Sequence, residues 1–250
     1  MKKILLIFSI IVIVFIIYIT TVDRKIYYVA LGDNITTLEL NNNKGFSNHI
    51  NNYLNHYNKL ESYINQFSKE NYRITDIISD INNNKKIIVG NREKTIKNAL
   101  IKADLLTLSI GLNDFTAKIN NQNIDYINDY QTLYNYVDQI CNDLEQLLVL
   151  IRQYCKEEIF LVGMYYPYSI QNIKLVNVFS YLNNRFKDIS EFYDINYVDI
   201  YDLFMENPNY ISSTMIYPSK EGLEVIASQI IVTINTTIIK NSWFYWERLL

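Results

Sequence analysis

Two pairs of polar residues follow short apolar runs of this 250-residue chain. Asp33 and Asn34 come directly after residues 27–32, and Asn113 and Asp114 follow residues 105–111 after one intervening residue, Leu112. Carboxyl groups exchange protons, whereas side-chain amides donate and accept hydrogen bonds but have no removable proton of useful acidity. Because an amide cannot form an acyl-enzyme, Asn34 and Asn113 predict hydrogen bonding rather than nucleophilic attack.

Strands and helices must alternate along the chain to position these residues. Short apolar runs predict strands at residues 27–32, 62–67, 105–111, 159–164 and 197–200. Apolar residues at helical spacing predict helices at residues 46–57, 74–81, 94–103, 133–154, 175–193 and 220–239. The polar residues 82–92 and 116–130 are expected to form loops. This alternation predicts an α/β domain whose parallel strands are joined by crossover helices.

The functional crevice of such a sheet lies beyond the carboxyl ends of its strands. Three segments fall at such ends or in the loops after them: residues 33–34, residues 113–114 and residues 207–219. We therefore expect these segments to meet in space.

The order of these segments resembles the SGNH (GDSL) hydrolase superfamily, and most closely its membrane-attached or lipoprotein-like branch in Gram-positive bacteria and their relatives. The resemblance covers residues 27–239. The family's first block, Gly-Asp-Ser-Leu-Thr, corresponds to residues 32–36, Gly-Asp-Asn-Ile-Thr, and its third block, Gly-x-Asn-Asp, is intact at residues 111–114. The resemblance implies a three-layer, flavodoxin-like fold with about five parallel strands flanked by helices.

The same resemblance places the family's catalytic triad on residues of different chemistry. The serine position falls on Asn34. The fifth block, Asp-x-x-His-Pro, corresponds to residues 214–218, so the acid position falls on Thr214 and the base position on Tyr217. Pro218 and the following Gly222 match the family frame.

The oxyanion-hole positions of the family fall on Asn71, where the family has glycine, and on Asn113. Asn34 cannot attack an ester, and a phenol such as that of Tyr217, with an ordinary pKa near 10, is a poor base at neutral pH. A threonine at position 214 cannot stabilise an imidazolium. We therefore expect a protein that has lost esterase activity and binds or scaffolds instead.

The alternative is an active hydrolase of acyl or acetyl esters that uses a different nucleophile, Thr36 or Thr37. Such a hydroxyl needs an activating base. The only histidines, His49 and His56, lie seven residues apart on one helix and far in sequence from the fifth block, so we interpret them as ordinary helix residues.

The carboxylates Asp33 and Asp114 are pocket candidates together with Thr36. A structural role for the two carboxylates is favoured at least as much as a role in catalysis. Asp33 is expected to bond backbone amides of its own turn, and Asp114 is expected to cap the segment that follows it.

Residues 4–22 form an uncharged, apolar run behind Met1-Lys2-Lys3. As a helix this run would span roughly 28 Å, close to the hydrocarbon thickness of a bilayer. The lysines favour a cytoplasmic N-terminus. We expect residues 1–22 to be an uncleaved signal anchor; a cleavable signal peptide is the competing interpretation, which lacks a small-residue cleavage site. The protein is then a single-pass cell-membrane protein with its domain on the extracytoplasmic face.

The domain proper is expected at residues 26–240, followed by a C-terminal tail at residues 241–250. That tail holds the aromatic run Trp243-Phe244-Tyr245-Trp246. Such a run is typical of a segment at a membrane interface. It is equally consistent with a hydrophobic tail that packs on the domain.

A formal net charge of −3 gives no basis for nucleic-acid binding. Cys141 and Cys155 are predicted on one helix about 21 Å apart, too far for a disulfide, so both are expected to be core thiols. Neither a metal-ligand cluster nor a phosphate-binding glycine loop is apparent, so no cofactor or metal is expected. The partners expected are the membrane and an envelope glycan, lipid or peptide.

Overall fold

The computed structural model describes residues 25–37, 45–119, 130–168, 172–213 and 216–235. Its main sheet has five parallel strands, in the order β2-β1-β5-β6-β7. The strands are β1 (Ile26–Gly32), β2 (Leu60–Ile64), β5 (Leu105–Ser109), β6 (Glu158–Val162) and β7 (Asn196–Val198). This parallel sheet and its strand order confirm the doubly wound, flavodoxin-like arrangement expected from the sequence.

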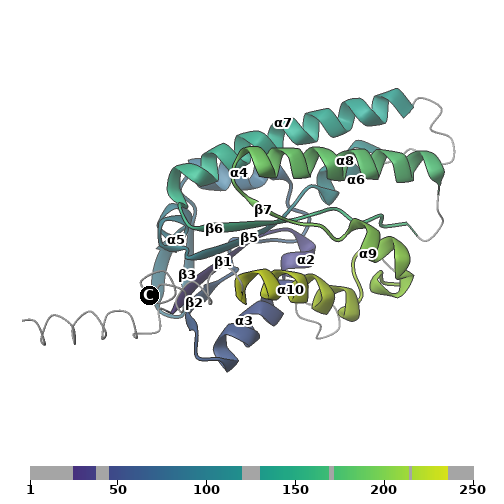
Figure 1. Ribbon diagram of the computed structural model, residues 1–250. Coiled ribbons are helices and arrows are strands. Elements are labelled where there is room, and N and C mark those ends of the chain that lie inside the picture. Colours follow the sequence, from purple (N-terminus) through teal and green to yellow (C-terminus); the bar gives the residue numbers. More distant parts are fainter. Residues whose placement is uncertain (1–24, 38–44, 120–129, 169–171, 214–215, 236–250) are drawn as a thin grey trace, which may run out of the picture.

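Helices cover both faces of the sheet, which gives three layers (Figure 1). One face carries α3 (Phe46–His56) and α10 (Lys220–Ile234), and the other carries α4 (Ile74–Asn82), α5 (Ile96–Lys102), α7 (Tyr130–Tyr154) and α8 (Ile173–Phe192). Shorter helical segments are α2 (Asn34–Thr37), α6 (Leu112–Ile119), α9 (Tyr201–Glu206) and the 3-10 turn η3 (Pro208–Tyr210).

Burial explains why the central strands are the clearest in the sequence. Every residue of β1 and β5 is buried, because helices cover these strands on both faces. The edge strand β2 is only partly buried, and its apolar pattern is correspondingly weaker. It begins two residues before the predicted start and ends at Ile64, because the chain turns there through a hydrogen bond from Ser68 N to Asn65 O (2.9 Å).

Residues 82–92 were expected to be a loop, and this expectation is wrong. They contain most of an antiparallel hairpin, β3 (Lys86–Val89) paired with β4 (Arg92–Thr95). Its two-residue turn places Gly90 at φ +61°, a left-handed conformation that glycine adopts readily. The Gly-Asn pair at residues 90–91 is the signal that sequence reasoning passed over.

The expectation of a loop at residues 116–130 is also wrong for its first residues, 116–119. Residues 112–119 form α6, which buries Phe115 and Ile119 one helical turn apart. Residues 120–129 lie outside the described part of the chain.

Two further expectations concern the cysteines and the membrane. Cys141 and Cys155 are buried free thiols, and burial raises the pKa of Cys141 to about 12 and that of Cys155 to about 11. Within the described ranges no helix is both long and apolar enough to cross a bilayer. The anchor expected at residues 1–22 and the tail at residues 241–250 lie outside those ranges.

Candidate active site

The carboxyl ends of β1 and β5 bring the two polar pairs together. These strands are neighbours, with Gly32 opposite Ser109, and Asp33 N donates to Ser109 O at 3.1 Å. Gly32 has φ +151°, and a Cβ there would lie 2.2 Å from Ser109 O. Only glycine allows this approach, so the first turn after β1 is held directly against the end of β5.

Three asparagines lie together at this edge and share one acceptor atom. We call them the asparagine cluster: Asn34, Asn71 and Asn113. The side-chain oxygen Oδ1 of Asn34 accepts hydrogen bonds from the backbone N–H of Asn71 (2.8 Å) and from Nδ2 of Asn113 (3.2 Å). Asn113 Nδ2 also donates to Tyr72 O at 3.0 Å. The exposed fractions of Asn34 and Asn113 are only 6% and 7%. Asn34 and Asn113 are therefore a buried pair, whereas Asn71 is an exposed residue that contributes its backbone N–H.

Two donors directed at one atom fix the orientation of the Asn34 amide. In the opposite orientation the Asn34 NH₂ group would face the N–H of Asn71, and neither group could accept a hydrogen bond. The carbonyl oxygen of Asn34 thus lies between the two groups that the family resemblance assigns to the oxyanion hole.

Asn71 contributes its backbone rather than its side chain. Its φ is +59°, the left-handed region that glycine and asparagine tolerate best. This conformation fits a position at which the resembling family has glycine. It also directs the Asn71 N–H toward Asn34 Oδ1.

Asp33 and Asp114 both satisfy backbone groups. Asp33 Oδ1 accepts from Ile35 N (3.2 Å), which confirms its expected role in its own turn. Both oxygens of Asp114 accept from Ile74 N (3.2 Å), at the start of α4. The expectation that Asp114 caps the segment after itself is wrong, because α6 already begins at Leu112 and the carboxylate instead caps α4.

Burial dominates the ionisation of both carboxyl groups. It raises the pKa of Asp33 to about 7 and that of Asp114 to about 6. For Asp33 the hydrogen bond from Ile35 N opposes this rise, and the charge of Asp114 adds to it. An ionised buried carboxylate costs free energy unless it is paired, so both groups titrate close to neutrality.

Tyr217 lies half-buried in the loop that leads to α10. Its backbone O accepts from Ser212 N (2.9 Å), and the hydroxyl of Tyr165 donates to the preceding carbonyl, Ile216 O (2.8 Å). Burial, followed by the charges of Asp33 and Glu70, raises the pKa of the Tyr217 phenol above its usual value. The phenol is protonated at neutral pH and is not a general base.

Tyr165 is a site residue that sequence reasoning missed. It follows β6 at the carboxyl edge, is buried, and holds the Tyr217 loop through its hydrogen bond to Ile216 O. Its place just after a predicted strand was the available signal. Thr214, which the family resemblance places at the acid position, lies outside the described residues.

Gly222 keeps the loop close to α10. A Cβ at Gly222 would lie 2.2 Å from Tyr210 O. The side chain of Ser219 caps α10 by accepting from Gly222 N (3.2 Å). These contacts explain why Pro218, Gly222 and the backbone at Tyr210 pack closely against one another.

The alternative nucleophiles are poorly placed. Thr36 is fully buried, and among the described residues its Oγ1 has no hydrogen-bond partner. The hydroxyl of Thr37 donates to Asp33 O at 3.3 Å. In the ranges that the structure covers, neither His49 nor His56, both on α3, makes a hydrogen bond to the asparagine cluster or to Tyr217.

No group of three or more metal-ligating side chains is found among the described residues. The side chains at this edge are amides, hydroxyls and two carboxyl groups that bond backbone amides. The arrangement is suited to hydrogen bonding.

No protein-family model matches the chain, and no curated protein matches its sequence. Solved structures do match. The lipase Lip_vut3 from a goat rumen metagenome is 19% identical and superposes with a TM-score of 0.67 over 82% of this chain and 95% of that chain. The acetylxylan esterase Axe2 from Geobacillus stearothermophilus is 15% identical, with a TM-score of 0.63 over 85% of this chain and 95% of that chain. The chain therefore has an SGNH-like esterase/lipase fold.

Catalytic mutants of Axe2 also match, in which a serine, an aspartate or a histidine is changed to alanine. The aspartate and the histidine lie three residues apart in that esterase. Thr214 and Tyr217 have the same spacing in this chain.

Proposed function

We propose that this protein is a membrane-anchored, extracytoplasmic SGNH-like protein that does not hydrolyse esters and that binds a ligand or acts as a scaffold in the cell envelope. One observation carries the proposed loss of hydrolysis. The side-chain oxygen of Asn34 accepts hydrogen bonds from both Asn71 N and Asn113 Nδ2, the groups that would stabilise an oxyanion.

Ester hydrolysis needs those donors free to receive the negative charge that develops on the substrate oxygen. Here a substrate oxygen would first have to displace Asn34 and break two hydrogen bonds, each worth about 1 kcal/mol net. The amide that fills the hole stands at the position of the nucleophile, and Tyr217 holds its proton. Attack, proton transfer and oxyanion stabilisation are therefore all impaired by residues of one small region.

Hydrolysis through Thr36 or Thr37 is the rival proposal, and its geometry is unfavourable. A substrate reaches the fully buried Thr36 hydroxyl only if the turn after β1 opens. The Thr37 hydroxyl already donates to Asp33 O.

The ligand chemistry that fits this edge is neutral. Asn34 and Asn113 are bonded to each other and nearly covered, so a ligand meets the half-buried Tyr217 and the loop around it. A phenol and backbone groups suit a glycan or a peptide that offers hydroxyl or amide groups. We infer that an envelope polymer of this kind is the partner.

The test is hydrolysis of short-chain aryl esters by the purified full chain, together with labelling by a fluorophosphonate. We expect the rate to equal that of heat-inactivated protein, and we expect no label. Hydrolysis well above this control, lost in Thr36→Ala or Thr37→Ala, would overturn the proposal.

A gain-of-function series sharpens this test. Asn34→Ser alone restores a hydroxyl and empties the oxyanion donors but supplies no base. The triple variant Asn34→Ser, Thr214→Asp, Tyr217→His supplies all three groups. We expect its hydrolysis rate to exceed that of Asn34→Ser by at least about 10²-fold, because triad members act as a unit. Equal rates for the two variants would show that the frame cannot support this chemistry.

A further inference from the structure

The edge of the sheet opposite the asparagine cluster exposes apolar side chains. This amino edge consists of the residues at the amino ends of the five strands and of the helix ends that lead into them. Tyr57, Ile101 and Phe192 have exposed fractions of 56%, 64% and 81%. They lie at the C-terminal ends of α3, α5 and α8, directly before β2, β5 and β7.

These three residues are spread across the whole sheet. In the order β2-β1-β5-β6-β7 they stand before the first, third and fifth strands. With neighbouring strands about 4.8 Å apart, they span roughly 19 Å along the edge. Because α3 lies on one face of the sheet and α5 and α8 on the other, only a broad partner could contact all three at once. A single exposed apolar residue would need no explanation.

Both ends of the described domain leave from this same edge. Lys25 Nζ donates to Asn58 Oδ1 (3.1 Å), and Tyr53 OH donates to Asn235 Oδ1 (2.9 Å). Tyr53 and Asn58 lie at the C-terminal end of α3. The chain before Lys25 and the chain after Asn235 therefore start from one corner of the amino edge.

The sequence on either side of that corner is suited to lipid. Only two residues, Asp23 and Arg24, separate Lys25 from the apolar run of residues 4–22. Fully extended, this connection spans about 10 Å. On the other side, the tail carries Trp243-Phe244-Tyr245-Trp246, the aromatic residues favoured at membrane interfaces.

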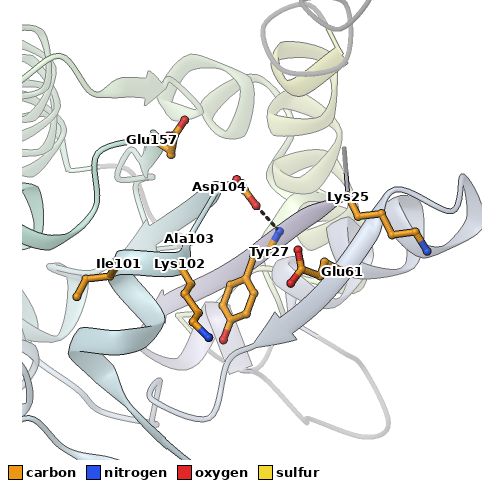
Figure 2. A pocket seen from close by; sticks show the side chains of 8 residues that line it. All are labelled: Lys25, Tyr27, Glu61, Ile101, Lys102, Ala103, Asp104 and Glu157. Carbon is orange, nitrogen blue, oxygen red and sulfur yellow. Dashed lines mark hydrogen bonds between the residues drawn. The ribbon is translucent and has the colours of Figure 1, made fainter. Parts of the chain in front are cut away.

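A hollow of about 480 Å³ opens in the amino edge. Figure 2 shows its lining, which carries the ammonium groups of Lys25 and Lys102 and the carboxylates of Glu61, Asp104 and Glu157. Lysine ammonium groups suit lipid phosphates. Because charges of both signs line the hollow, the edge has no strong preference for anionic lipid.

We propose that the amino edge is the surface on which the domain rests on the headgroup layer of the bilayer. The inference rests on the membrane anchoring proposed above. The short connection holds the edge within about 10 Å of the headgroups, and a tether that short gives a high local concentration. Weak insertion of Tyr57, Ile101 and Phe192 is then sufficient to orient the domain.

This orientation directs the asparagine cluster away from the membrane. The seven residues of β1 separate the two edges by roughly 23 Å. The cluster and Tyr217 then face outward, and their partner comes from outside the bilayer rather than from its lipids.

The experiment uses the full chain in phosphatidylcholine vesicles that contain a lipid with a nitroxide on its headgroup. A fluorophore is attached to Ile101→Cys or Phe192→Cys. The matched control is Ile173→Cys, whose native side chain is 71% exposed at the start of α8, on the opposite edge. All three positions are solvent-exposed, and the native cysteines are buried, so folding and labelling are comparable.

We expect quenching at positions 101 and 192 to be several-fold stronger than at position 173. A protein that floats with the vesicles but shows equal or absent quenching at all three positions overturns this inference and leaves the anchoring intact. A protein that does not float overturns the anchoring, and the inference with it. Intrinsic tryptophan emission tests the tail separately, because Trp243 and Trp246 are the only tryptophans in the chain.

Discussion

The two halves of the candidate site differ in how strongly the fold depends on them. In the donor half, Asn71 N and Asn113 Nδ2 both donate to Asn34 Oδ1, and Asn113 Nδ2 also donates to Tyr72 O. In the acid–base half, Tyr217 is half-buried, and it is the backbone around it that makes the contacts.

This difference shows which parts of an SGNH-like site also hold the structure together. A buried amide that pairs with backbone groups cannot be replaced without leaving those groups unsatisfied. A side chain on a loop, whose position is set by backbone contacts, accepts other residues at little cost in stability. Asn113 belongs to the first class and Tyr217 to the second.

Asp33 lies between the two halves, because its Oδ2 accepts a long hydrogen bond from Asn113 Nδ2 (3.5 Å) and its charge raises the pKa of Tyr217. Its ionisation should give the largest effect. Its pKa is about 7 in the folded protein, against an ordinary value near 3.8. Below about pH 3 the carboxyl group is protonated in both states, so the stabilisation is fully present there. It is lost as the pH rises from the ordinary pKa of 3.8 to the folded pKa of about 7, because over this range the unfolded chain is ionised while the folded protein is still protonated. The free energy of unfolding should fall by up to about 4 kcal/mol over this range.

Urea denaturation of the wild type and of Asp33→Asn between pH 4 and pH 8 measures this contribution. In the variant, the free energy of unfolding should decrease much less over this pH range. The part of the decrease that is due to Asp114 should remain. Asp188→Asn, which removes an exposed carboxylate on α8, is the control and should keep the wild-type slope. Parallel curves for wild type and Asp33→Asn would show that Asp33 ionises freely in the folded state.

The donor half can be compared with the acid–base half by paired truncations. Asn113→Ala leaves Tyr72 O and Asn34 Oδ1 short of a donor in a buried site, which should lower the free energy of unfolding by about 2 kcal/mol. Tyr217→Phe removes only the hydroxyl of a half-buried phenol and should change it by less than about 0.5 kcal/mol.

Asn52→Ala, at an exposed position of α3, is the matched asparagine control and should be close to neutral. Similar losses for Asn113→Ala and Tyr217→Phe would remove the distinction between the halves. A double-mutant cycle between Asn34→Ala and Asn113→Ala should give a coupling energy of about 1 kcal/mol, because the two side chains share one hydrogen bond.

The sequence predicted the strands and long helices because their apolar residues follow a clear period. The buried residues of α4 are Ile74, Ile77 and Ile81. Their spacing of three and four residues is typical of a helix with one buried face. Sequence reasoning failed for the β3–β4 hairpin. These four-residue strands contain no buried residue, so they look like a polar loop unless the Gly-Asn turn is noticed.

The sequence also located the site but not its internal bonding. Family blocks placed Asn34, Asn71 and Asn113 at one edge, yet nothing in a sequence says which atom of an amide faces which donor. The bond from Asn71 N to Asn34 Oδ1 joins residues 37 positions apart and depends on the backbone conformation at Asn71. The two hydrogen bonds that Asn34 Oδ1 accepts therefore appear only in three dimensions.

Asn71 gives the smallest and most selective test of the donor half. Its backbone N–H donates to Asn34 Oδ1 and its φ is +59°, so this residue acts through its backbone conformation rather than through its side chain. Asn71→Gly keeps the N–H and accepts this φ, and it should change the free energy of unfolding by less than about 0.5 kcal/mol. Asn71→Ala keeps the same N–H but adds a Cβ that disfavours the left-handed region, at a cost of about 1 kcal/mol. Urea denaturation of the two variants side by side separates backbone from side chain. If glycine proved the more destabilising substitution, the side chain of Asn71 would be the group that holds the donor half in place.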